Sequence, residues 1–184
     1  MDTAISFTIR ILDPGDAPTW AKLRLEALET HPLAFGASLP GEFSVLVETA
    51  RDRLKVSEDS AAFGAFIGSA LVGTVGIRRE GGAKERHKCL LVAMYVRSED
   101  RRTGIGESLV RSAIQLARSW NGVEQVLLVV NDVAPEAKRL YERLGFRSWG
   151  IEPRSLRHDG LYADATHMIL DLREGPTTSG KRTI

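Results

Sequence analysis

The chain has 184 residues, of which 43% are hydrophobic, and this is the size and apolar content of one ordinary domain with its own core. Its 25 basic and 24 acidic residues are interspersed and leave a net charge of +1, so the charge pattern does not favour nucleic acid binding. The single cysteine, Cys89, excludes an internal disulfide, and no signal peptide or apolar run of about 18 residues is recognisable. We therefore expect a cytoplasmic protein without a membrane segment, whose function lies in local groups of residues.

The N-terminal part is predicted to contain one strand and two helices. Alternating apolar residues predict a strand over 6–12, which the turn residues 13–16 end. Apolar residues spaced three and four apart predict a helix over 20–28, which stops ahead of Pro32 because the residue before a proline disfavours helical geometry. A second helix is predicted over 44–55.

The middle of the chain is predicted to form a sheet. The runs 61–67 and 70–78 are separated by Gly68-Ser69, which is the spacing of a tight hairpin. The run 89–96 reads CLLVAMYV and is continuously apolar, which predicts a central strand covered on both faces by helices. The run 125–130 is the second of this kind. A helix connects these two apolar runs, so we expect them to be parallel strands.

A basic corner broken by glycines, Arg101-Arg102-Thr103-Gly104-Ile105-Gly106, follows the first apolar run. The two glycines allow a tight turn with several N–H groups pointing the same way. A helix predicted over 105–120 adds the positive end of its dipole, and the arginines supply forked donors. Because the corner lies at the carboxyl end of a strand, it is predicted to bind phosphate.

The C-terminal part is predicted to contain one helix and two strands. The helix starts near Pro135 and ends at Gly145, a usual stop signal. The strands are predicted over 146–151 and 162–172. Residues 175–184 are rich in Thr, Ser, Gly and basic side chains and are predicted to be a frayed tail.

Two motifs resemble the GCN5-related N-acetyltransferase (GNAT) superfamily. The corner at 101–106 fits the family's acyl-coenzyme A signature, Arg-x-x-Gly-x-Gly. The following strand and helix share with the family the residues Asn131, Ala137, Tyr141, Gly145 and Phe146. Residues found in many relatives also occur in the N-terminal segment, namely Leu23, Arg24, Ala27, Leu28, Pro32, Ala34, Phe35 and Glu42. The resemblance covers about 6–172 and implies one GNAT domain over 1–174.

The resemblance implies an α/β fold with a mixed sheet of six or seven strands and about four flanking helices. The sheet would splay between its central parallel strands, 90–96 and 125–130, and the pantetheine arm of the cofactor would lie in the gap. A bulge around 94–96 would turn backbone groups toward it. The residues implied to contact acyl-coenzyme A are Met94, Tyr95, Val96, Arg101, Arg102, Thr103, Gly104, Ile105, Gly106, Asn131, Ala137 and Tyr141.

The implied reaction is direct transfer of an acetyl group from acetyl-coenzyme A to an amine in a ternary complex. Tyr141 is the implied catalytic residue, acting as the acid beside the leaving sulfur, while the N–H of Val96 would polarise the thioester carbonyl. The base is not assigned; the candidates are a water relay and the side chains of Glu26, Glu42, Glu85, His87 and Tyr95. The acceptor would be shaped by 20–54 and by the connection 152–163.

Other functions are weighed against this interpretation. A dinucleotide site is disfavoured because Leu109 stands where GxGxxG needs its third glycine, and no GxxxxGK[ST] occurs. A regulatory module that binds acyl-coenzyme A without turnover is the alternative. Cys89 lies in an apolar run and is predicted to be a structural thiol, and the scattered histidines predict no metal site. The acceptor, the acyl preference and a homodimer are left open.

Overall fold

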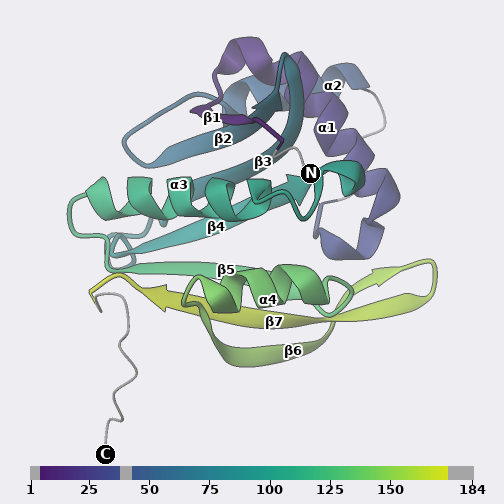
Figure 1. The fold of residues 1–184 in the computed structure, drawn as a ribbon. Coiled ribbons are helices and arrows are strands. Elements are labelled where there is room, and N and C mark those ends of the chain that lie inside the picture. Colours follow the sequence, from purple (N-terminus) through teal and green to yellow (C-terminus); the bar gives the residue numbers. More distant parts are fainter. Residues whose placement is uncertain (1–4, 38–42, 174–184) are drawn as a thin grey trace, which may run out of the picture.

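The computed structural model describes residues 5–37 and 43–173 (Figure 1). In chain order the elements are β1 (Thr8–Ile11), the 3-10 turn η1 (Pro14–Asp16), α1 (Ala17–Thr30), η2 (Pro32–Ala34), α2 (Phe43–Arg53), β2 (Ser60–Ile67), β3 (Ala70–Arg79), β4 (Lys88–Val96), η3 (Ser98–Asp100), α3 (Ile105–Ser119), β5 (Gln125–Asn131), α4 (Pro135–Arg143), β6 (Arg147–His158) and β7 (Leu161–Asp171). Glu42 and the expected tail over 175–184 lie outside the described residues. Within them, no helix is both long and apolar enough to cross a membrane.

The strands form one mixed sheet in the order β1-β2-β3-β4-β5-β7-β6. Only the β4–β5 pair is parallel, and every other neighbouring pair in this sheet is antiparallel. β4 is the fourth of the seven strands, so the prediction that the run 89–96 is central is confirmed. The tight hairpin at Gly68-Ser69 is confirmed as well, since Ile67 pairs with Ala70 across it.

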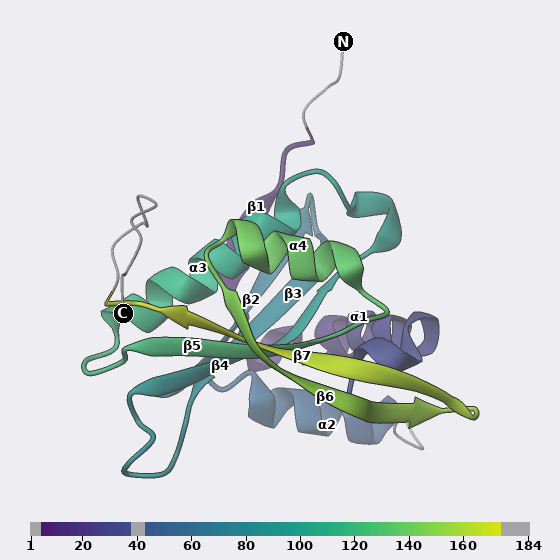
Figure 2. The same cartoon turned by 90° about the horizontal axis from the view of Figure 1, so that it is seen from below.

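Helices cover both faces of the sheet (Figure 2). Alternate side chains of a strand point to opposite faces, and here they enter two separate cores. Phe63 and Val72 belong to the core beneath α3, whereas their neighbours Ala62 and Leu71 belong to the core beneath α1 and α2. The same alternation places Val96 on the α3 face and Tyr95 on the α1 face. The two faces of the sheet therefore carry different parts of the site described below.

The helix predictions are confirmed, with small differences at their ends. The apolar stripe of α3 is fully buried at Leu109, Val110, Ala113 and Ala117. α1 begins three residues earlier than the pattern indicates, because the turn η1 precedes it: the Asp13 carboxylate accepts from the N–H of Gly15, and the Asp16 carboxylate accepts from the N–H of Asp13. This turn is a local capping arrangement that apolar spacing does not reveal.

The C-terminal hairpin is longer than expected. Most of the predicted connection over 152–163 is strand, because β6 runs to His158 and β7 already begins at Leu161. The pairing shifts register between Glu152 and Leu156, where Arg154 has a φ of 54°. Polar residues and this bulge break the alternation that would have identified the strand. The hairpin extends past the ends of the other strands toward the side of α1 and α2 (Figure 2).

The expectation that both central strands are covered on both faces is wrong at two positions. Val92 of β4 is 37% exposed and Val129 of β5 is 53% exposed. Both positions follow the last residues of the β4–β5 pairing, where the two strands separate. A continuously apolar strand can therefore also contain exposed positions where it separates from its neighbour.

Candidate functional site

The site is built around a gap in the middle of the sheet. β4 and β5 pair only from Lys88 to Leu90 on one strand and from Gln125 to Leu127 on the other. Beyond these residues β4 stays paired with β3 as far as Val96, and β5 stays paired with β7 to its end. The expected splay is therefore present. It leaves one edge of β4 from Leu91 onward without a strand partner.

A bulge lies in β4 beside this open edge. The pairing with β3 shifts between Gly76–Val92 and Thr74–Tyr95, so that one residue of β3 faces two residues of β4, Ala93 and Met94. Ala93 has a φ of 52°, a left-handed conformation that non-glycine residues seldom adopt. The bulge thus begins just before the expected segment 94–96 and reorients the strand that follows.

The bulge sets the direction of the Val96 amide. The N–H of Arg97 donates to the carbonyl of Val72 on β3 at 2.9 Å. Successive amides of an extended strand point to opposite sides, so the N–H of Val96 points away from β3 and toward the gap. This direction leaves the Val96 amide available to a ligand in the gap, as the resemblance implies.

The glycine corner forms the wall of the gap at the start of α3. Arg102 and Gly104 both have left-handed φ values, 65° and 88°, separated by Thr103. Thr103 stabilises the turn by donating its hydroxyl to the carbonyl of Asp100 at 2.6 Å. The first bond of the helix runs from the N–H of Ser108 to the carbonyl of Gly104. The N–H groups of residues 105–107 therefore have no intrahelical acceptor.

The amides of the corner form a cradle for an anion. Within the described part of the chain, no carbonyl or side chain accepts from the N–H groups of residues 102–104. A Cβ on Gly104 would meet no atom within 4 Å, so this backbone faces open space. A Cβ on Gly106, in contrast, would lie 3.3 Å from Met94 Cε and 3.4 Å from Leu140 Cδ2. Gly104 allows the turn, and Gly106 allows β4, α3 and α4 to approach closely.

The two arginines of the corner have different surroundings. Arg101 points back into the protein, donating from Nε to the carbonyl of Val96 at 3.1 Å, while its Nη2 lies 2.9 Å from His31 Nε2. Burial and the charge of Arg101 lower the pKa of His31, which favours the neutral ring that accepts this bond. Arg102 is exposed. Of the two arginines expected to grip phosphate, the geometry favours Arg102.

The other side of the gap is formed by the end of β5 and by α4. Tyr141 is 5% exposed and lies edge-on to Phe146, with the ring centroids 5.8 Å apart. Burial raises the pKa of Tyr141 well above its ordinary value, so the phenol stays protonated. Asn131 is 7% exposed, and its Oδ1 is buried without a hydrogen-bond partner among the described residues. Ala137 is partly buried and packs against the core that contains Tyr141.

Some of the expected contact residues can reach a ligand only through their backbone. Ile105 is 1% exposed, and its side chain is in the core. The Tyr95 ring lies on the α1 face, where its hydroxyl donates to Glu26 Oε1 at 3.0 Å. Arg97 Nε donates to the other oxygen of Glu26 at 3.1 Å. Glu26 and Tyr95 thus form one cluster on the α1 side of the gap.

The candidates for a catalytic base fall into two groups. Glu26 and Tyr95 lie beside the gap, as just described. Glu85 and His87 lie at the opposite end of β4, where the carbonyl of His87 accepts from the N–H groups that begin β5. They are too far along the strand to reach the splay. Cys89 is fully buried, and burial raises the pKa of its thiol to about 11, which agrees with a structural role.

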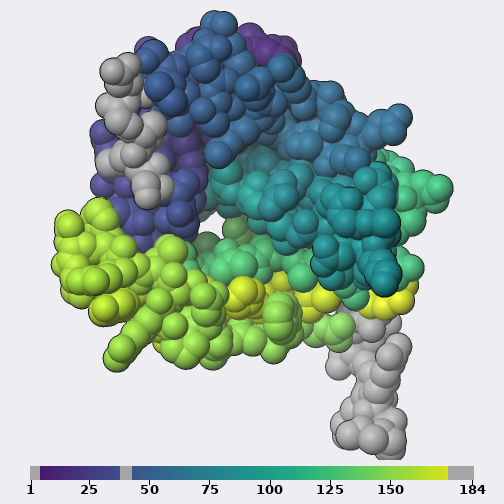
Figure 3. All heavy atoms as spheres, turned by 180° about the vertical axis from the view of Figure 1, so that it is seen from behind, coloured from purple at the N-terminus to yellow at the C-terminus, as the bar shows by residue number. Residues whose placement is uncertain are grey.

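The molecule is also hollowed on the α1 side. Figure 3 shows a recess between the purple and blue N-terminal elements and the yellow-green β6–β7 hairpin. The hairpin meets the N-terminal part just after η2, where a Cβ on Gly36 would lie 3.9 Å from Leu156 Cδ2. The recess therefore lies on the face of the sheet opposite to α3.

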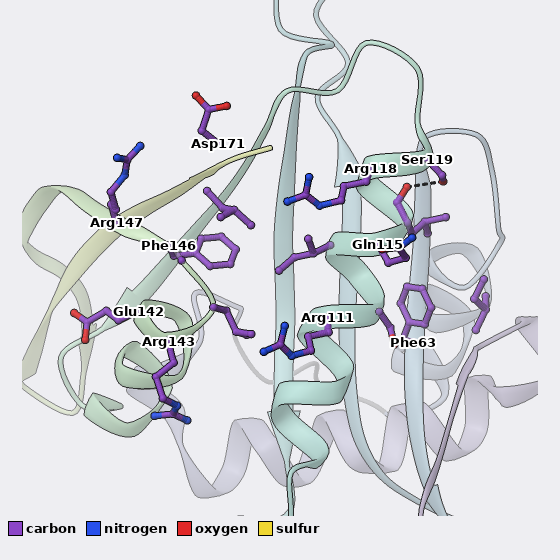
Figure 4. A pocket seen from close by; sticks show the side chains of 17 residues that line it. Phe63, Arg111, Gln115, Arg118, Ser119, Glu142, Arg143, Phe146, Arg147 and Asp171 are labelled. Carbon is purple, nitrogen blue, oxygen red and sulfur yellow. Dashed lines mark hydrogen bonds between the residues drawn. The ribbon is translucent and has the colours of Figure 1, made fainter. Parts of the chain in front are cut away.

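A broad groove of about 1260 Å³ runs along the C-terminal half of α3 (Figure 4). It is lined by Arg118 and Ser119 of α3 and by Phe146 and Arg147 after α4. Arg118 donates a hydrogen bond from Nη1 to the carbonyl of Leu172, which links α3 to the residue that follows β7. None of the expected site residues lines the groove, because it lies at the end of α3 opposite to Gly104. We therefore place the site at the splay and not in this groove.

A splayed mixed sheet with a glycine corner and a helix start at its gap is the architecture of an acyl-coenzyme A-dependent transferase. A model of the acetyltransferase (GNAT) family matches residues 23–146 of this chain. The chain belongs to this family.

Individual relatives agree with that assignment. The chain is 29% identical over 149 residues to mycothiol acetyltransferase from Thermobispora bispora and 37% identical over 81 residues to human N-acetyltransferase 8. The matches cover 78% and 44% of this chain but only 48% and 35% of those proteins. The chain thus spans about half, or less, of the length of these relatives.

Solved structures show the same fold. The acetyltransferase of the GNAT family from Streptococcus pneumoniae has a TM-score of 0.78 at 22% identity, covering 91% of this chain and 100% of that one. A phosphinothricin acetyltransferase from Sinorhizobium meliloti, determined in complex with acetyl-coenzyme A, has a TM-score of 0.77 at 19% identity. That match covers 96% of this chain and 93% of the other.

Proposed function

We propose that this protein transfers an acetyl group from acetyl-coenzyme A to an amine by direct attack in a ternary complex. The observation that carries the proposal is the position of the unpaired edge of β4 beside the free amides of the glycine corner. Pantetheine contains amides that can pair with an open strand edge, and a pyrophosphate needs the N–H groups that a helix start offers. Both parts of one ligand are thereby accommodated.

The donor side fits coenzyme A in three further respects. The open space at Gly104 leaves room for phosphate against the backbone, and Arg102 is exposed beside it. The buried Oδ1 of Asn131 lacks a donor, and a pantetheine amide would supply one. The Val96 amide points into the gap, where it would donate to the thioester carbonyl and stabilise the negative charge that grows during attack.

Two proton transfers accompany the reaction. A free alkylamine has a pKa near ~10.4, so it must lose a proton to become a nucleophile. Among the candidate bases that the structure describes, Glu26 is a carboxylate that lies beside the gap. Its two oxygens also accept hydrogen bonds from Tyr95 and Arg97. At the other end of the reaction, Tyr141 donates a hydrogen bond to the leaving sulfur. Its raised pKa keeps the donor proton in place.

The test is to incubate the purified protein with acetyl-coenzyme A and a panel of amines and to follow the release of free thiol. We expect release that depends on both the protein and one class of amine. Cofactor binding, measured in parallel by calorimetry, separates the alternative. Tight binding of acetyl-coenzyme A without thiol release for any amine would identify a binding module instead of an enzyme.

Direct attack makes a second measurable prediction. The described residues around the gap include no activated nucleophile, since Cys89 is buried with a raised pKa. Mass spectrometry of the protein mixed with acetyl-coenzyme A alone is therefore expected to show the unmodified mass. A stoichiometric gain of one acetyl group, lost again when an amine is added, would show a covalent intermediate and reject the ternary complex.

A further inference from the structure

Arg24 of α1 is a buried cation that has no carboxylate partner among the described residues. It is 6% exposed, and its Nη1 has no hydrogen-bond partner among the residues that the structure describes. Burial, together with the nearby charge of Arg53, lowers the pKa of Arg24 to about 10. The carboxylate two residues along, Glu26, is turned to Tyr95 and Arg97. A guanidinium in these surroundings is under-satisfied.

The position of Arg24 relates it to the gap. Its guanidinium lies over the ring of Phe35, 4.4 Å from the centroid. The Phe35 ring in turn meets the edge of Tyr95, with centroids 6.4 Å apart. Tyr95 directly precedes Val96, whose amide points into the splay. Arg24 is thus two aromatic rings away from the place where the acetyl group would be presented, and it is on the face opposite to the glycine corner.

The surroundings of Arg24 favour an anionic ligand. A buried charge that lacks a partner is costly, and structural arginines are normally paired with a carboxylate or a carbonyl. A buried arginine without a partner gains most from a ligand that brings an anion, because its guanidinium has already lost its water in the free protein. Arg53 adds positive potential, so the same place disfavours a cation. A planar guanidinium offers two parallel N–H groups to a carboxylate or a phosphate.

We propose that Arg24 anchors an acceptor subsite for an anionic group, so that the acceptor is an amine that also carries a carboxylate or a phosphate. This assignment deepens the proposed function and rests on it. The anionic group would bind at Arg24, the body of the acceptor would lie along Phe35 and Tyr95, and the amine would reach the thioester beside Val96. The donor enters from the α3 face and the acceptor from the α1 face.

The test uses matched acceptors in the thiol-release assay. Amino acids are compared with their α-amides, and phosphoethanolamine is compared with ethanolamine. We expect at least one anionic member to exceed its neutral partner by about tenfold or more in kcat/KM. The amino acid and phosphate pairs distinguish the two sources of the anion. If neutral partners of both pairs are used equally well, the subsite is rejected although the enzyme is active.

Variants of Arg24 separate binding from packing. Arg24→Met keeps much of the side-chain volume and removes the charge, so it is expected to abolish the preference for the anionic acceptor while leaving the Kd for acetyl-coenzyme A unchanged. Because an unpaired buried charge is removed, the melting temperature is expected to rise by about 2–4 °C. Arg24→Lys is expected to retain part of the preference. Arg51→Met, on the exposed side of α2, is the matched control and should alter neither property.

The outcomes are distinct. A lower melting temperature in Arg24→Met, with equal loss for anionic and neutral acceptors, would make Arg24 a packing residue and overturn the subsite. Absence of thiol release for every amine with the unaltered protein would instead overturn the proposed function. Retention of the anionic preference in both Arg24 variants would likewise reject the assignment, because the preference would then arise elsewhere.

Discussion

Replacing Gly104 with Asp is expected to weaken acetyl-coenzyme A binding by at least about a hundredfold. A Cβ here meets no protein atom within 4 Å, so the side chain would project into the space that we assign to the pyrophosphate. A carboxylate about 5 Å from one phosphate charge repels it by roughly 3 kcal/mol at an effective dielectric constant of about 20, which corresponds to a factor of about 100 in Kd. Calorimetric titration with acetyl-coenzyme A measures the change.

Gly122→Asp is the matched control for this substitution. Gly122 also has a left-handed φ, 75° against 88° at Gly104, and a Cβ there also meets no atom within 4 Å. It follows the other end of α3, so it carries the same backbone strain and the same charge away from the corner. Asp tolerates a left-handed φ better than most residues and its charge is favourable at the start of a helix, so Gly104→Asp should fold. Unchanged affinity in Gly104→Asp would contradict the phosphate role of the corner.

The fold and the geometry of the glycine corner could be predicted because their signals are local in the sequence. The continuously apolar run of β4, the apolar stripe of α3 and the spacing of the glycines all lie within 89–120, and the structure keeps them in that order. Conformational demands are local too: the left-handed φ of Gly104 is a property of one residue. A motif of this kind therefore predicts both its own geometry and its place at a strand end.

The proposed acceptor side could not be predicted, because it is made by side chains that are distant in sequence. Arginine side chains are usually exposed, and Arg24 is buried only because Phe35 and the surrounding helices pack around it. The contact between Arg101 and His31 joins residues 70 positions apart, and it links the end of α1 to the glycine corner. Periodicity carries no signal for either contact.

The long hairpin was missed for a related reason. Trp149 and Ile151 of β6 are 60% and 68% exposed, so this strand buries no regular face. Apolar alternation predicts a strand only where one face is covered, and backbone pairing with β7 holds β6 regardless of its side chains. The two halves of the site thus differ in origin. The proposed donor half is encoded in a short motif, and the proposed acceptor half depends on tertiary packing between α1, η2 and the hairpin.

Tyr141→Phe is expected to lower kcat by about a hundredfold or more while changing the Kd for acetyl-coenzyme A by less than about threefold. The phenol acts late, when charge develops on the leaving sulfur, so the loss falls on turnover. Burial keeps the phenol neutral because it raises the pKa, and a proton donor with a raised pKa stays active as the pH rises. The ratio of the two kcat values should therefore stay constant from about pH 7 to pH 9.

The same substitution is suited to the test because it removes one atom and leaves the packing in place. The Tyr141 ring lies in the core against Phe146, so Phe fills the same volume, and thermal melting should be nearly unchanged. Tyr162→Phe removes a hydroxyl from a residue that is 50% exposed on β7 and serves as the control for thermal melting. Full turnover in Tyr141→Phe would remove this residue from the proton-donor role. Equal losses in binding and turnover would instead assign it to holding the cofactor, since both states would then have lost the same interaction.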